Sequence, residues 1–111
     1  MKFTCSSQVL SRGITAVRNA VGSPISNPIV ENIHVSCEVD KVRFHATNLN
    51  LTIRCEGEAQ VMEEGDIVLP SKIIVEMFTD LPSGEAACET QEETARIQCG
   101  EFKARMKGQS G

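Results

Sequence analysis

Cysteine and histidine are the residue types most ready to do chemistry in a short chain, and here both are scattered. The cysteines are odd in number, far apart, and never at the C-x-x-C spacing of a zinc or redox site: Cys5, Cys37, Cys55, Cys88 and Cys99. We therefore expect reduced thiols that pack as small core residues and bind no metal.

No catalytic arrangement is recognisable in the sequence. His34 and His45 fall in strand-like stretches without a carboxylate or nucleophile at a telling distance. The paired acids at 63–64 and 92–93 fall in predicted turns, where solvated charge is the expected role. Phosphate-binding loops, nucleophile elbows and metal motifs are missing. The sequence predicts a protein that is not an enzyme and needs no cofactor.

The charges are unevenly distributed along the chain. Residues 1–55 carry six Lys/Arg against three Asp/Glu, and residues 56–111 carry five against twelve, within a net charge of −4. Because no acid precedes Glu31, a helix formed by the first residues would be positive without a competing carboxylate. An acidic chain with one locally basic face is compatible with phosphate contacts.

The length and hydropathy of the chain predict one soluble domain. A chain of 111 residues has room for a single modest core. No apolar run approaches the roughly 20 residues of a membrane span, and the start lacks the apolar stretch of a secretory signal. We expect a cytoplasmic protein.

The apolar pattern predicts the elements that must position these charges. Leu10, Ile14, Val17 and Val21 recur at helical spacing after two serines, which predicts a helix over 7–21. A Gly- and Pro-containing loop at 22–28 ends it. Alternating residues then predict strands over 29–38, 41–47, 51–62 and 67–69.

The same order of elements then begins again. A second helix is predicted from Pro70-Ser71 onward, and strands over 85–90, 94–99 and 102–107 follow it. We interpret strand, helix and three strands, occurring twice, as an internal duplication. The predicted fold is α+β, with both helices on one side of antiparallel sheets. The apolar face of the second helix is expected to consist of Ile73, Ile74, Met77, Phe78 and Leu81.

Four stretches, in order and at the right distances, resemble the amino-terminal domain of bacterial beta sliding clamps, the DNA polymerase III beta subunits. Residues 1–4 resemble the start of the family, and residues 27–33 resemble its LPIL-x-N-ILL stretch. Residues 46–51 resemble its T-A-T-D-L-E turn, and residues 69–82 resemble its VPA-[RK]-x-L…LP segment. The resemblance covers nearly the whole chain.

The resemblance implies a DNA polymerase processivity factor without catalytic activity of its own. In that family each protomer has three such domains, and two protomers close head to tail into a homodimer ring around duplex DNA. Residues 1–111 would be the first domain. The polymerase and the clamp loader bind through later domains, so no site for them is expected in these residues.

Duplex DNA would be contacted at its phosphates, without reading of the base sequence. Arg12 on the polar strip of the first helix and Lys72 near the start of the second fall on family positions that carry basic residues. Ser23 stands in a loop where the family often has an arginine, so it can offer only a neutral hydrogen bond. The alternative for Arg12 and Lys72 is an ordinary solvated cation. Asn48 and Asn50 replace the usual acids of the family, with no derivable effect.

The resemblance also suggests where the ring would close. Phe102 falls on a family position that packs against the third domain of the neighbouring protomer, and Met77 and Leu81 are expected nearby. Core packing is the alternative for all three, and the sequence favours it for Met77 and Leu81.

Two other classes of function stay open on the sequence alone. One is a stand-alone α+β protein-interaction module that uses a sheet edge or the surface around Met77 and Phe78. The other is a small hydrolase whose site has no recognised motif.

Overall fold

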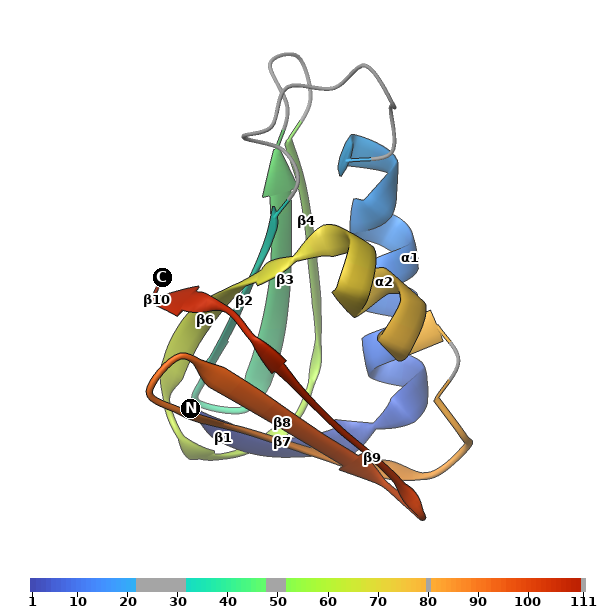
Figure 1. Cartoon of the computed structure of the whole chain (residues 1–111), viewed down its shortest axis with the longest axis vertical. Coiled ribbons are helices and arrows are strands. Elements are labelled where there is room, and N and C mark those ends of the chain that lie inside the picture. The colour runs from blue at the N-terminus through green and yellow to red at the C-terminus, as the bar shows by residue number, and fades with distance from the viewer. Residues whose placement is uncertain (22–31, 48–51, 80, 111) are drawn as a thin grey trace.

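The computed structural model describes residues 1–21, 32–47, 52–79 and 81–110. Figure 1 shows the two helices of these ranges next to each other, with β2, β3 and β4 to their left and β7, β8 and β9 below them. The predicted α+β architecture is confirmed, and no helix in the described ranges is long and apolar enough to cross a membrane. In chain order the elements are β1 (Lys2–Ser6), α1 (Ser7–Val21), β2 (Asn32–Glu38), β3 (Lys41–Thr47), β4 (Thr52–Glu58), β5 (Gln60–Glu63), β6 (Gly65–Pro70), α2 (Ser71–Thr79), β7 (Glu85–Gln91), β8 (Thr94–Cys99), β9 (Phe102–Lys107) and β10 (Gln109–Ser110).

The strands of the described residues form two antiparallel sheets, here called sheet A and sheet B. Sheet A has the order β5-β1-β7-β8-β9, and sheet B has the order β10-β6-β2-β3-β4. Each strand of one half of the chain has a counterpart in the other half. The opening strand of each half pairs with the three-stranded meander of the other half, so neither half completes its sheet alone. The predicted duplication is present, and the halves exchange their first strands.

Helix α1 begins where the sequence predicts because its first turn is capped and anchored. The Ser6 hydroxyl accepts a hydrogen bond from the Gln8 N–H at 3.2 Å, the geometry of an N-cap. Buried Ser7 exchanges two hydrogen bonds with Gly84, one through its N–H and one through its hydroxyl, at 2.8 and 3.2 Å. The apolar stripe lies in the core, with Leu10, Ile14 and Val17 fully buried.

Helix α2 is shorter than predicted and buries a narrower stripe. It ends at Thr79, so Leu81 lies beyond it. Ile74 and Phe78, four residues apart, are buried, whereas Ile73 is 43% exposed. The prediction for Ile73 was wrong, because the residue one step before a buried position lies about 100° around the helix.

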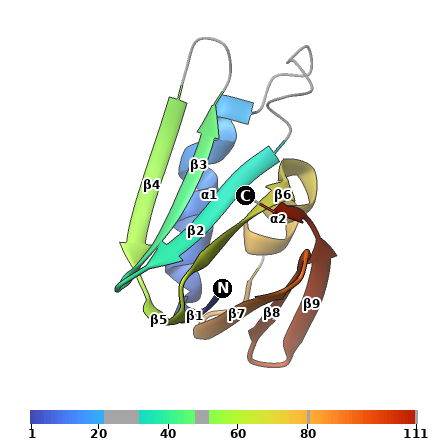
Figure 2. The ribbon, with the colours of Figure 1, turned by 90° about the vertical axis from the view of Figure 1, so that its left-hand side faces the viewer.

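One predicted strand turns out to be two. The segment predicted as a single strand over 51–62 breaks at Ala59, whose N–H donates to the Asp40 carbonyl at 2.9 Å. β4 before the break belongs to sheet B, and β5 after it belongs to sheet A. Figure 2 shows the chain passing from one sheet to the other at this point. Strand alternation continues through such a crossing, so the sequence pattern does not reveal it.

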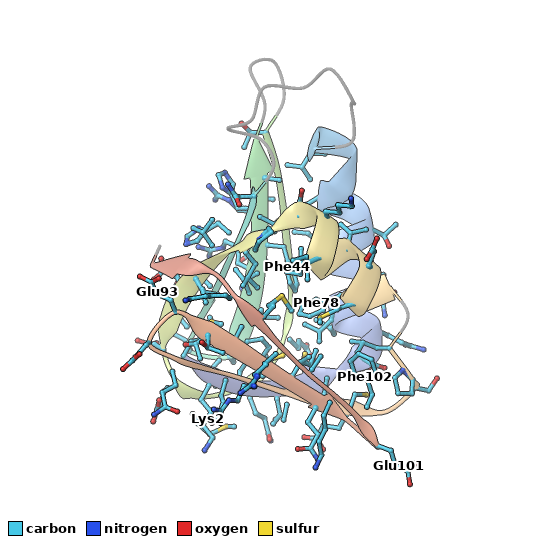
Figure 3. The ribbon with its side chains drawn as sticks, in the orientation of Figure 1. Lys2, Phe44, Phe78, Glu93, Glu101 and Phe102 are labelled. Atoms are coloured by element: carbon cyan, nitrogen blue, oxygen red, sulfur yellow. The ribbon has the colours of Figure 1, made fainter. Side chains whose placement is uncertain are left out.

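The core lies between the two sheets and the helices. Phe44 from sheet B and Phe78 from α2 both belong to it (Figure 3). Helix α1 approaches sheet B closely at Gly13, where an added Cβ would lie 2.3 Å from the Phe44 ring. A second close approach joins Gly57 of β4 to Val9, also at 2.3 Å for an added Cβ. These two glycines set the distance between α1 and the sheet.

Candidate nucleic-acid and subunit interfaces

The exposed strip of α1 carries the first predicted DNA-contacting residue. Gln8, Arg12 and Thr15 are exposed and Ser11 is partly exposed, as the helical pattern requires. Arg12 has no ion-pair partner within the described residues. The helix contains no acidic residue at all. Arg12 is therefore an uncompensated cation on the helical side of the molecule.

Lys72 is the second residue of α2 and is also exposed. It has no ion-pair partner among the described residues, and the first turn of α2 contains no acid. A cation at this end of a helix faces the positive end of the helix dipole, which is mildly unfavourable without an external anion. Because α1 packs against α2, Arg12 and Lys72 are carried by neighbouring helices (Figure 1).

The loop predicted over 22–28, with Ser23, lies outside the described residues, as do Asn48 and Asn50. The candidate nucleic-acid surface therefore consists here of the exposed strips of α1 and α2.

The residues predicted for ring closure come from β9, from α2 and from the loop after α2. Phe102 opens β9, which pairs only with β8 in the described part of sheet A, so β9 is an edge strand. Cys99, opposite Phe102, directs its thiol to the Pro82 carbonyl at 3.2 Å, which holds this hairpin against the loop after α2. Leu81 belongs to the same loop. Phe102, Met77 and Leu81 are each partly buried and packed against the core, which fits core packing as well as a partner contact.

A cluster of basic side chains on the outer face of sheet A was not predicted from the sequence. Five of the eleven Lys/Arg residues alternate outward from β1, β8 and β9 there, although the second half of the chain is strongly acidic overall. The signal was present as alternation in 94–99 and 102–107, but averaging charge over half the chain concealed it. These residues are Lys2, Arg96, Lys103, Arg105 and Lys107.

Four of the five cysteines are buried in the core, as predicted, whereas Cys55 is only partly buried. Burial raises the pKa of Cys5 to about 12, with the neighbouring Cys99 and Glu85 acting in the same direction. Burial also raises the pKa of Cys88 and of Cys37. No group of three or more metal-binding side chains occurs among the described residues. These thiols are poor nucleophiles in the folded protein because little thiolate forms at neutral pH.

Comparison with known proteins identifies the family of this α+β, two-helix domain. The chain matches the family model of the DNA polymerase III beta subunit, N-terminal domain, over residues 1–110, and it belongs to that family. It is 33% identical over 87 residues to the beta sliding clamp of Synechocystis, a match over 77% of this chain and 22% of that protein. It is 34% identical over 84 residues to the beta sliding clamp of Caulobacter vibrioides, over 76% of this chain and 23% of that protein.

Solved structures agree with this assignment. A Caulobacter crescentus pol III beta structure superimposes with a TM-score of 0.89 at 28% identity, covering 100% of this chain and 31% of that one. A putative DNA polymerase III beta subunit from Eubacterium rectale gives 0.90 at 28%, covering 100% and 30%. The resemblance and the fold predicted from the sequence are therefore confirmed. The chain spans less than a third of the length of the curated relatives it matches.

Proposed function

We propose that this chain is the first of three domains of a bacterial DNA polymerase III beta subunit, a processivity factor in the cytoplasm that encircles duplex DNA. The observation that carries the proposal is the family match over residues 1–110 together with coverage of less than a third of each relative. The described residues measure 36 × 25 × 23 Å along their principal axes, too small to surround a duplex. Further domains and a second protomer would complete the ring, and domains beyond these residues would bind the polymerase and the clamp loader.

The helices would form the inner wall of this ring and hold it loosely around DNA. Arg12 and Lys72 would reach phosphates as flexible, unpaired cations, which gives attraction without base recognition and permits sliding. Ser23 would add a neutral hydrogen bond. The protein would be a non-catalytic accessory subunit, because its action is to remain on DNA and not to transform it.

Ring closure would use the open edge of β9. Phe102, with Met77 and Leu81 beside it, would pack against the third domain of the partner protomer. A half-buried aromatic side chain on an edge strand suits such a contact, because the open edge offers backbone hydrogen-bonding groups and the aromatic ring offers apolar area.

The test of the ring uses the full-length gene product that contains this chain. The protein is loaded onto nicked circular DNA, and its retention is followed before and after the circle is cut. We expect retention on circles and loss from linear DNA, since a ring slides off a free end. Equal retention on both forms, or none on either, contradicts the ring and leaves the stand-alone interaction module as the better account.

The individual residues are tested in the same protein. Arg12→Ala and Lys72→Ala should lower loading, whereas Arg54→Ala, an exposed cation on sheet B, should not. Phe102→Ala should shift the protein from dimer to monomer in light scattering, with Ile73→Ala as the matched apolar control. Unchanged loading and an unchanged dimer would assign these side chains to ordinary surface and core roles.

A further inference from the structure

The outer face of sheet A places two like charges opposite each other, and its charged groups form no ion pair within the described residues. Arg96 and Arg105 are direct partners in the β8–β9 register, an arrangement that destabilises an antiparallel sheet. On the same cross-strand row, Lys2 lies between Glu63 and Glu89, and Glu89 lies between Lys2 and Arg96. None of these five groups takes part in an ion pair within the described residues, so neither acid neutralises a cation by direct contact.

A hollow of about 630 Å³ lies on this face. The cross-strand row next to the charged one begins with two short residues, Thr4 and Ala87, which are in register with Gln98 and Lys103. The long side chains of the charged row thus stand beside a low floor. Met62, 51% exposed, supplies an apolar end on β5. Figure 3 shows Lys2 pointing away from the helices, so this face is distinct from the proposed DNA-facing side.

We propose that this hollow binds a short, extended acidic peptide of a protein partner, in which carboxylates flank an apolar side chain. Lys2, Arg96 and Arg105 pair with the carboxylates. The apolar side chain rests on Ala87 and Met62. Its residues do not include those proposed for ring closure, although Arg105 lies on β9, the strand that also carries Phe102.

Glu89 favours a peptide over nucleic acid. Its carboxylate lines the hollow between the cations, where it repels a phosphate backbone, which carries acceptors and no donors. A peptide offers backbone N–H groups that donate to Glu89 while its carboxylates reach the cations on either side. The charges at this position therefore favour a peptide that offers both hydrogen-bond donors and acidic side chains.

The binding test uses this 111-residue chain and a capped, fluorescent hexapeptide that alternates glutamate and leucine. Saturable amide shift changes should appear in β1, β7, β8 and β9, with binding that weakens as salt rises. The same peptide with glutamine in place of glutamate should bind at least about tenfold more weakly, because the ionic contacts are lost. Equal binding of the two peptides, or shifts confined to other elements, overturns the proposal.

Substitutions separate binding from folding. Arg96→Glu with Arg105→Glu should abolish detectable peptide binding, whereas Lys41→Glu with Arg54→Glu on the outer face of sheet B should not. Arg105→Gln serves as a second variant. It should weaken binding several-fold while leaving the unfolding midpoint unchanged or raised, because it removes the repulsion from Arg96. A lowered midpoint with unchanged binding would give Arg105 a structural role and overturn its assignment.

A competition experiment tests whether nucleic acid, and not a peptide, occupies the hollow. A short duplex and a single strand of the same length are titrated against the labelled peptide at equal ionic strength. We expect neither to displace it at equimolar concentration. Displacement by either one through the same residues would replace the peptide with nucleic acid as the occupant.

Discussion

Sheets A and B have equivalent strand orders, but they differ in whether the charged side chains on their outer faces form ion pairs. On the outer face of sheet B, the Arg43 guanidinium lies 2.9 Å from the Glu56 carboxylate and 3.7 Å from that of Glu38. His34 Nε2 lies 2.7 Å from Asp66 Oδ2. On sheet A the cations stand in register with each other and with two acids, Glu63 and Glu89, but the described residues form no ion pair there.

The difference separates what a duplicated fold must keep from what it is free to change. Both halves keep a buried serine at the first residue of the helix, Ser7 and Ser71, and both keep the apolar alternation toward the core. The outward residues do not enter the core, so they can change without altering the topology. The charged residues on the outer face of sheet B form ion pairs, whereas the cations on the outer face of sheet A do not.

Thiol reactivity should show the largest difference between the sheets. The inner face of sheet A holds the buried Cys5, Cys88 and Cys99, whereas Cys55 on the edge strand β4 of sheet B is only partly buried. At pH 8, a thiol with the pKa of Cys5 has about a thousandfold less thiolate than an unfolded cysteine, so alkylation should be slower by about that factor. Mass spectrometry after iodoacetamide pulses should find Cys55 modified first. In urea all five should react alike, and early labelling of Cys5 in the native protein would contradict its burial.

The close contact of α1 with sheet B should give the largest loss of stability. Gly13→Ala places a methyl group against the fully buried Phe44 ring and should destabilise the domain by about 2–3 kcal/mol, despite the better helix propensity of alanine. Gly57→Ala meets Val9, which is only partly buried and has room to rotate, so its cost should be about 1 kcal/mol. Urea unfolding followed by circular dichroism measures both. A neutral Gly13→Ala would show that the helix can move away from the sheet.

Substitutions in two hairpin turns should change the stability of the domain in opposite directions. Val39 in sheet B and Gly100 in sheet A are each the first residue of a two-residue turn, with φ of 57° and 61°. Val39→Gly should raise stability by about 1 kcal/mol, because a β-branched residue is strained at positive φ. Gly100→Ala should lower it by about 1 kcal/mol through backbone conformation alone, since an added Cβ there meets no atom within 4 Å. Thermal unfolding of both variants tests the pair, and shifts of the same sign would rule out turn strain as their cause.

The ion pairs of sheet B should give the smallest effect, seen as a pH dependence. A hydrogen bond from Arg43, and then its charge, hold the pKa of Glu56 below its ordinary value. The stabilisation is present above the unfolded pKa of about 4.3, and it is lost as pH falls through the lower folded pKa. Arg43→Gln should raise the Glu56 pKa in a carboxyl-carbon NMR titration. Arg54→Gln, which removes a charge but no hydrogen bond, should raise it less, and an equal rise would assign the shift to charge alone.

Local patterns in the sequence were sufficient to predict much of the fold. The stripe of Leu10, Ile14 and Val17 predicted α1, and the alternation in 94–99 and 102–107 predicted β8 and β9 with correct bounds. Local pattern failed at Ala59 and at Ile73. A crossing between sheets does not interrupt alternation, and the width of a buried stripe depends on the neighbour that covers it.

The sequence by itself determined two helices, a duplicated order of elements and the family, because helix periodicity, strand alternation and turn residues act over a few neighbouring positions. Tertiary structure alone decided that the halves exchange their first strands and that Gly13 sets the distance from α1 to the sheet. It also decided that Lys2 shares a face with Arg96 and Arg105. These features join residues tens of positions apart, and no local preference encodes which distant strands become neighbours.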